Sequence, residues 1–126
     1  MKSLAIARRY AKALLLIGKE DGEAETYREE LDGIAGLISE SRQLEQAISN
    51  PLYDASGRKK VLQAIVEKLE LSDAMRAFLL LLFDKGRFGF ISDINEFYQK
   101  LADELKGIAR ATLVSATELS DEAIEK

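Results

Sequence analysis

The sequence predicts an all-α protein: a six-helix bundle followed by a truncated strand/helix fragment. Apolar residues recur at three- and four-residue intervals through most of the first hundred positions, which is the period of amphipathic helices. Gly, Ser and Pro residues interrupt this pattern where turns between helices are needed. Of the 126 residues, 47% are hydrophobic and 32% charged, a balance typical of a globular chain that can form its own core.

Local signals set the expected helix ends. Gly22 follows the first helix, Asn50-Pro51 ends the third because the residue before Pro disfavours helical backbone, and Ser72 is the expected N-cap of the fifth. We expect helices over residues 3–19, 23–39, 42–49, 55–69, 73–85 and 91–105. The predicted core contains Leu31, Ile34, Ile65, Phe78, Leu82, Ile94 and Leu101.

The last twenty residues differ in character from the rest. The β-branched residues Thr112 and Val114, in a stretch of roughly alternating polarity, predict a strand over residues 109–117, and Ser120 has the character of a helix start. Neither a lone strand nor so short a helix is stable by itself. We therefore expect residues 1–106 to form an N-terminal helical bundle, and residues 107–126 a linker and the start of an incomplete C-terminal domain.

Composition excludes several kinds of chemistry. The chain has no Cys and no His, which removes thiolate sites, Cys nucleophiles and the usual general base near neutral pH. It also lacks the phosphate-binding loop, the dinucleotide-binding glycine pattern and the nucleophile elbow. Gly86-Arg87-Phe88-Gly89 is better explained as a turn than as a phosphate contact. We therefore expect no catalytic residue, no cofactor and no metal.

Charge is unevenly distributed along the chain. The net charge is −4, yet residues 1–20 hold five basic residues and one acidic residue. The acidic remainder is a poor match for nucleic acid or an anionic bilayer, and no apolar run approaches the ~20 residues that span a membrane. We expect a cytosolic protein with no nucleic-acid partner and no direct membrane insertion. The basic patch of Arg8, Arg9 and Lys12 is interpreted as a solvated face rather than an RNA contact.

Two of the expected helices have more apolar surface than one contact can cover. In the first, the charged side chains fall within a sector of roughly 100°, and in the fifth, Asp73, Arg76 and Asp84 mark a narrow polar strip. Either both helices lie at the centre of the bundle, or they share a groove that receives another helix. The sequence leaves both explanations open.

Several motifs, in order along the chain, resemble those of one known family. They are Ile6-Ala7-Arg8-Arg9-Tyr10-Ala11-Lys12-Ala13-Leu14, Asn50-Pro51, Phe78-Leu79-Leu80-Leu81-Leu82 before Lys85-Gly86-Arg87, Gly107-Ile108-Ala109-Arg110-Ala111, and Val114-Ser115-Ala116. This set is similar to the delta subunit of F-type ATP synthase, whose mitochondrial counterpart is the oligomycin-sensitivity-conferring protein. Family members continue into a C-terminal domain, and the resemblance implies that this chain carries only its beginning.

The resemblance implies a non-catalytic stator subunit, peripheral to the cell membrane on its cytoplasmic face, that ties the catalytic head to the peripheral stalk. It implies that the first and fifth helices receive the N-terminal helix of an alpha subunit, and that the b subunits are met through the missing C-terminal domain. Tyr10, Ala13 and Leu81 match family contact positions. The helical arcs add Ile6, Ile17, Ala77 and Leu80 to this expected partner-binding surface.

Two other functions compete with this interpretation. Bacterial transcription antitermination factors also begin with an Arg-rich amphipathic helix, so an RNA-binding helical module is the alternative, although the acidic body argues against it. A helical bundle that catalyses with carboxylates alone is the weakest alternative. A steep salt dependence of binding would indicate phosphate contacts, whereas an apolar groove would show little.

Overall fold

The structure, a computed structural model, describes residues 3–107. It contains α1 (Ser3–Asp21), α2 (Ala24–Glu40), α3 (Arg42–Ser49), α4 (Ala55–Lys68), α5 (Asp73–Asp84), a 3₁₀ turn η1 (Phe88–Phe90) and a sixth helix over residues 91–107. Within this described part all regular structure is helical, which confirms the predicted six helices to within two residues at each end. The strand expected at 109–117 and the helix expected from Ser120 lie outside the described residues.

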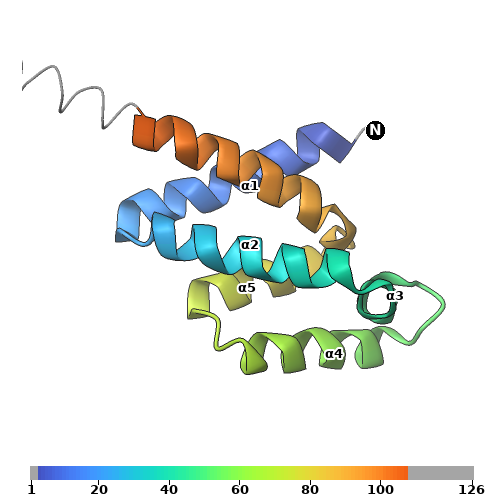
Figure 1. The fold of residues 1–126 in the computed structure, drawn as a ribbon. Coiled ribbons are helices and arrows are strands. Elements are labelled where there is room, and N and C mark those ends of the chain that lie inside the picture. Colours follow the sequence, from blue (N-terminus) through green and yellow to red (C-terminus); the bar gives the residue numbers. More distant parts are fainter. Residues whose placement is uncertain (1–2, 108–126) are drawn as a thin grey trace, which may run out of the picture.

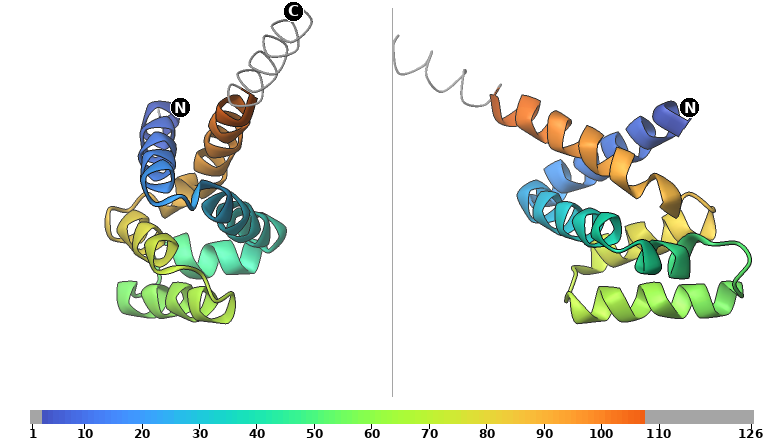
Figure 2. Two further views of the ribbon diagram at one scale, coloured as in Figure 1. Left: turned by 90° about the vertical axis from the view of Figure 1, so that its left-hand side faces the viewer. Right: turned by 45° about the vertical axis from the view of Figure 1, so that its right-hand side comes forward.

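The helices are stacked with α2 in the middle of the bundle (Figure 1). Helix α1 and the sixth helix cross at one end, and α4 lies at the opposite edge beside α3. Helices α1, α3 and α5 each pack against α2. In the left-hand view of Figure 2, α1 lies above α5 on one side of the bundle, while the sixth helix diverges from α1 on the other.

The core is apolar, and no polar or charged residue of the described part is buried. Helix α2 contributes more buried residues to this core than any other helix, and they recur at the three- and four-residue intervals seen in the sequence. Of the predicted core residues, Leu31, Ile34, Phe78, Leu82 and Ile94 are buried. The prediction was wrong for Ile65 and Leu101, which are only partly buried because they pack against this core from its edge.

Helix α5 is fixed to α2 at its first turn. Ser72 caps α5 by accepting a hydrogen bond from the Met75 N–H, as the sequence predicts. Glu30 of α2 accepts two more hydrogen bonds from Ser72, one from its N–H and one from its hydroxyl, both 2.7 Å long. This carboxylate at the positive end of a helix dipole sets where α5 begins relative to α2.

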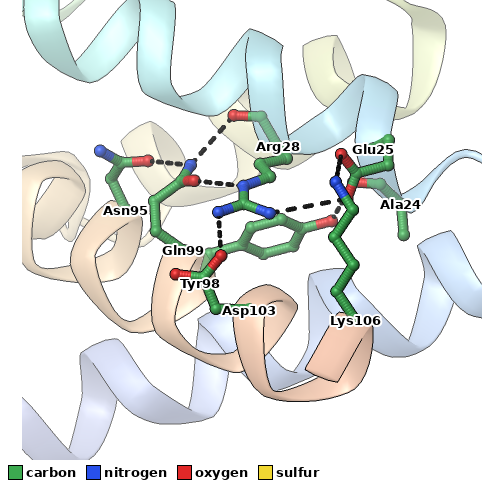
Figure 3. Close-up of polar contacts among 8 residues, drawn as sticks. All are labelled: Ala24, Glu25, Arg28, Asn95, Tyr98, Gln99, Asp103 and Lys106. Atoms are coloured by element: carbon green, nitrogen blue, oxygen red, sulfur yellow. Dashed lines mark hydrogen bonds and ion pairs between the residues drawn. The ribbon is translucent and has the colours of Figure 1, made fainter. Parts of the chain in front are cut away.

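A polar seam joins α2 to the sixth helix (Figure 3). Arg28 donates to Gln99 Oε1 at 2.6 Å and pairs with Asp103, whose hydrogen bond raises the pKa of Arg28 further. Beneath them Tyr98 is buried and donates to the Ala24 carbonyl at 2.7 Å, and burial raises the pKa of Tyr98 to about 12. The seam therefore fixes the direction in which the sixth helix leaves α2.

The corner between α1 and α2 is tight. The Glu23 N–H bonds to the Gly18 carbonyl at 2.9 Å across Gly22, whose φ of 77° suits glycine. Tyr27 donates to the Asp21 carboxylate, and this hydrogen bond raises the pKa of Tyr27 to about 12. A Cβ on Gly18 would lie 2.7 Å from the Cα of Ala24, so only glycine allows this approach of α1 to α2.

We expect Gly18→Ala to lower the free energy of unfolding by about 1–3 kcal/mol, because the added methyl group must push the backbone of α2 away. Urea denaturation followed by circular dichroism measures this. Gly33→Ala is the matched control, since Gly33 is exposed on α2 and has open space around its Cα. In this control the free energy of unfolding should rise by up to about 1 kcal/mol, because alanine has a higher helix propensity than glycine. Equal gains in both variants would contradict the prediction.

Helices α1, α4 and α5 end in the same kind of C-terminal cap, but different residue types occupy its left-handed position. Each has a residue with positive φ just after the cap, namely Gly22, Gly86 and, after α4, Glu70 with φ 53°. The following N–H reaches back to the helix in each case, as in the bond from Leu71 to the Val66 carbonyl. A side chain in this left-handed region is strained, so α4 is the least favourable of the three caps.

We therefore expect Glu70→Gly to raise the free energy of unfolding by about 0.5–1 kcal/mol, because strain at positive φ exceeds the added entropy of the unfolded chain. Thermal unfolding measures the gain. Glu67→Gly, inside the last turn of α4, should instead be destabilising by about 1 kcal/mol. A loss of stability in both variants would mean that the left-handed cap carries no strain.

Candidate functional site

Large apolar side chains remain on the surface of α1 and α5. Among the described residues, the exposed large hydrophobics include Leu4, Leu16 and Ile17 of α1 and Leu81 of α5. The others lie elsewhere on the bundle, namely Leu37, Leu52, Tyr53 and Leu69. Leu4 lines a hollow beside Phe97 of the sixth helix, and Leu16 lies ~100° around α1 from Ile17. Ile17 and Leu81 are therefore the exposed side chains on the two helix flanks where the sequence predicts a partner. Figure 2 shows α1 and α5 on one side of the bundle.

Helix α1 buries one face and leaves the neighbouring flank accessible. Ala7, Ala11 and Leu14 have no exposed surface, and they face the bundle. At ~100° per residue, the predicted partner-binding residues of α1 lie on the flank beside this buried face. Ile6 and Tyr10 are half-buried, Ala13 is exposed, and Ile17 is 46% exposed. The four residues therefore line one continuous strip along α1.

Helix α5 divides in the same way, with one exception to the prediction. Its buried face contains Met75, Phe78, Leu79 and Leu82. Ala77 is exposed and Leu81 is 44% exposed.

Leu80, also predicted for the partner-binding surface, is half-buried and lies elsewhere. It lines a hollow of about 200 Å³ together with Gln63 and Val66 of α4. The structure therefore places Leu80 on the α4 side of α5, whereas Leu81 is on another side of the helix.

One aromatic contact joins the accessible flank of α1 to the buried face of α5. The Tyr10 ring meets the Phe78 ring edge-on, with centroids 6.2 Å apart and planes at 70°. Arg87 Nη1 donates to the Tyr10 hydroxyl at 2.9 Å, and the guanidinium lies 5.7 Å from the Tyr10 ring centroid. Tyr10 is thus held by α5 on one side and by the turn after α5 on the other.

Arg87 is the residue of this junction that the sequence did not single out. The turn expected at Gly86-Arg87-Phe88-Gly89 is confirmed, since Gly86 has φ 71° and the Arg87 N–H bonds to the Leu82 carbonyl at 2.7 Å. Arg87 and Tyr10 are 77 positions apart, so no local pattern connects them. The Lys85-Gly86-Arg87 motif that follows the fifth helix was the one available signal.

The predicted basic patch of Arg8, Arg9 and Lys12 is exposed on α1. Arg8 lies over the Phe97 ring of the sixth helix, 5.2 Å from its centroid. Arg8 therefore has a cation–π contact within the described residues, whereas Arg9 and Lys12 have none.

The predicted partner-binding residues are half-buried or exposed on α1 and α5, and Leu80 is the one that faces α4. The flank of Ile6, Tyr10, Ala13 and Ile17 on α1, together with Ala77 and Leu81 on α5, is termed the α1/α5 surface below. Within residues 3–107, no group of three acidic side chains is arranged to hold a metal ion. No helix in the same range is long and apolar enough to cross a membrane.

Comparison with known proteins gives one consistent result. Residues 6–126 match the family described as ATP synthase delta (OSCP) subunit. The whole chain is 60% identical to the ATP synthase subunit delta of Desulfatibacillum aliphaticivorans and 58% identical to that of Desulforapulum autotrophicum, and it covers 69% of each. It is 39% identical to the ATP synthase subunit delta of Geobacter sp. (strain M21) and covers 70% of it. Of the functions that the sequence left in competition, these similarities favour the stator subunit over the RNA-binding module.

Proposed function

The chain belongs to the ATP synthase delta (OSCP) subunit family, and from this premise we propose that its α1/α5 surface binds the N-terminal helix of an alpha subunit. Members of this family are non-catalytic stator components of F-type ATP synthase. In this proposal residues 1–106 form the domain that meets the catalytic head. Binding there holds the head against the torque of the rotor, so that rotation drives synthesis instead of turning the head.

The exposed flank on each side of the Tyr10–Phe78 contact carries the proposal. Ile17 and Leu81 expose nearly half of their surface although both belong to helices that have another, well-buried face. An amphipathic helix laid between them would cover these side chains with its own apolar stripe. Ala13 and Ala77 are small and exposed, so the backbone of the guest helix can come close.

The energy available from such a surface suits a stable but reversible contact. Fully burying one Leu or Ile side chain contributes roughly 1.5–3 kcal/mol in transfer terms. Association costs and side-chain ordering consume part of this gain, so several anchors are needed for micromolar binding. The α1/α5 surface offers Ile6, Ile17 and Leu81 as aliphatic anchors, with the Tyr10 ring between them.

The rest of the assembly follows from the same family membership. The subunit is part of a complex peripheral to the membrane, and we propose that it works on the cytoplasmic face of the cell membrane. The relatives are longer than this chain, which spans 69% of the first two. We assign the proposed contact with the b subunits of the peripheral stalk to the C-terminal domain of family members.

Two substitutions test the α1/α5 surface. Leu81→Asp places a charge among the apolar anchors, and Ala13→Trp fills the space into which the guest backbone must come. Titration calorimetry with a peptide of the alpha-subunit N-terminus should show that each weakens binding at least about tenfold, which is 1.4 kcal/mol. Circular dichroism should remain helical, because both parent side chains are exposed.

Matched controls come from α4 and its C-cap, at the far edge of the bundle (Figure 1). Leu69→Asp introduces the same charge at a leucine that is 41% exposed, and Ala64→Trp adds the same bulk at an exposed alanine. Both controls should bind the peptide like the parent. If Leu81→Asp and Ala13→Trp also bind like the parent, the surface is assigned wrongly. If both lose their helical signal, these residues belong to the core and not to a binding surface.

A further inference from the structure

Arg87 stands beside the α1/α5 surface with a charge that the bundle does not neutralise. The ion pairs within residues 3–107 involve Arg28, Lys59 and Lys106, and none of them involves Arg87. The residue is half-buried, so its side chain is not fully surrounded by water. A guanidinium in this position gains more from a carboxylate than a fully exposed one does, because screening by water is weaker.

The guanidinium of Arg87 also has unused hydrogen-bonding capacity. Of its five N–H donors, one bonds to an acceptor among residues 3–107, namely the Tyr10 hydroxyl. This contact and the ring of Tyr10 hold the guanidinium in one orientation beside the apolar strip. A planar guanidinium with free parallel donors is the group best matched to a carboxylate, which it binds through two hydrogen bonds.

The charge around this side of the bundle is positive, in contrast with the chain as a whole. Helix α1 contains four basic and two acidic residues, α5 contains one basic and two acidic residues, and the turn after α5 adds Lys85 and Arg87, so these elements together carry a net charge of +3. The whole chain has a net charge of −4. The bases lie on α1 and in the turn after α5, whereas α5 itself carries the exposed Asp73 and Asp84, of which Asp84 pairs with Lys59. A guest segment with a carboxylate near the turn after α5 therefore matches this end of the surface in charge.

We propose that Arg87 is the polar anchor of the α1/α5 surface. It forms an ion pair with one carboxylate at the edge of the guest helix's apolar stripe, and so selects an acidic amphipathic helix and sets its register. The inference rests on the proposed function and adds the chemistry of the partner to it. Tyr10 acts as a positioning residue, since its hydroxyl orients the guanidinium and its ring packs on Phe78.

A purely structural role for Arg87 makes a different prediction. In that case its contact with Tyr10 only ties the turn after α5 to α1, and any substitution lowers stability without regard to the charge of the guest. The anchor role requires energetic coupling between Arg87 and one particular carboxylate of the guest. A double-mutant cycle measures that coupling directly.

The experiment titrates the chain with a peptide of the alpha-subunit N-terminus and with peptides in which each Asp or Glu is changed singly to Asn or Gln. The chain variants are Arg87→Met, Arg87→Lys and Tyr10→Phe. Arg76→Met is the matched control, because Arg76 is an exposed arginine of α5 on the α4 side, beside Leu80. The control loses the same charge from within α5, away from the turn that carries Arg87.

We expect Arg87→Met to weaken binding of the parent peptide about tenfold, less than a fully buried charge pair loses, because Arg87 is only half-buried. One carboxylate substitution in the peptide should weaken binding to the parent chain by a similar factor and have no effect on the Arg87→Met chain. Arg87→Lys should recover only part of the loss, since an ammonium is a point charge. Tyr10→Phe should give a smaller loss, and Arg76→Met should stay within about twofold of the parent.

Equal weakening of every peptide by Arg87→Met, with no carboxylate coupled to it, would overturn the anchor while leaving the proposed function in place. If Arg87→Met fails to fold, the carboxylate scan against the parent chain still decides, because an anchor requires one substitution with a large loss. If every peptide, including the parent peptide, fails to bind the parent chain, the proposed function itself fails.

Discussion

The apolar stripe of α2 is the surface on which the rest of the bundle is assembled. Five of its side chains are buried: Tyr27, Leu31, Ile34, Ala35 and Ile38. Helices α1, α3 and α5 pack on this helix, and the sixth helix is hydrogen-bonded along it. Helices α1 and α5 each pack against α2, but they do not pack closely along each other. Each therefore keeps one apolar flank at the surface, and the α1/α5 surface is a direct consequence of this shared support.

Most of the helical architecture could be predicted from the sequence, because its signals are local. The Asn50-Pro51 break and the Ser72 cap act within a few residues, so they mark helix ends without knowledge of the fold. Side-chain neighbours were harder to predict. The arc of α5 indicated that Leu80 and Leu81 are apolar, but only packing decides that Leu80 faces α4. Arg87 was missed because its contact with Tyr10 spans 77 positions.

The sequence offered two explanations for the extra apolar surface of α1 and α5. Burial accounts for one face of each helix, and the groove that receives a partner is our proposal for the adjacent flank. One face is buried as in a central helix, with Ala11 and Leu79 fully inaccessible. The adjacent flank is open, as expected of a groove that receives a partner. Periodicity alone cannot separate these cases, because a buried residue and a partner-binding residue have the same apolar character and neighbouring helical angles. Burial in the folded chain is the observation that separates them.

The same arrangement explains how a small helical bundle can bear mechanical load without any chemistry. A guest helix on the α1/α5 surface would press on two helices that are both fixed to α2, one through the tight Gly18 corner and the other through Glu30 and Ser72. From α2 the load passes to the sixth helix through the seam of Arg28, Gln99 and Asp103 (Figure 3). Close-packed interiors deform little, so force applied at the surface is carried through the bundle and not absorbed within it. Rigidity along this path, and not a reactive group, is what the proposed stator role requires of the fold.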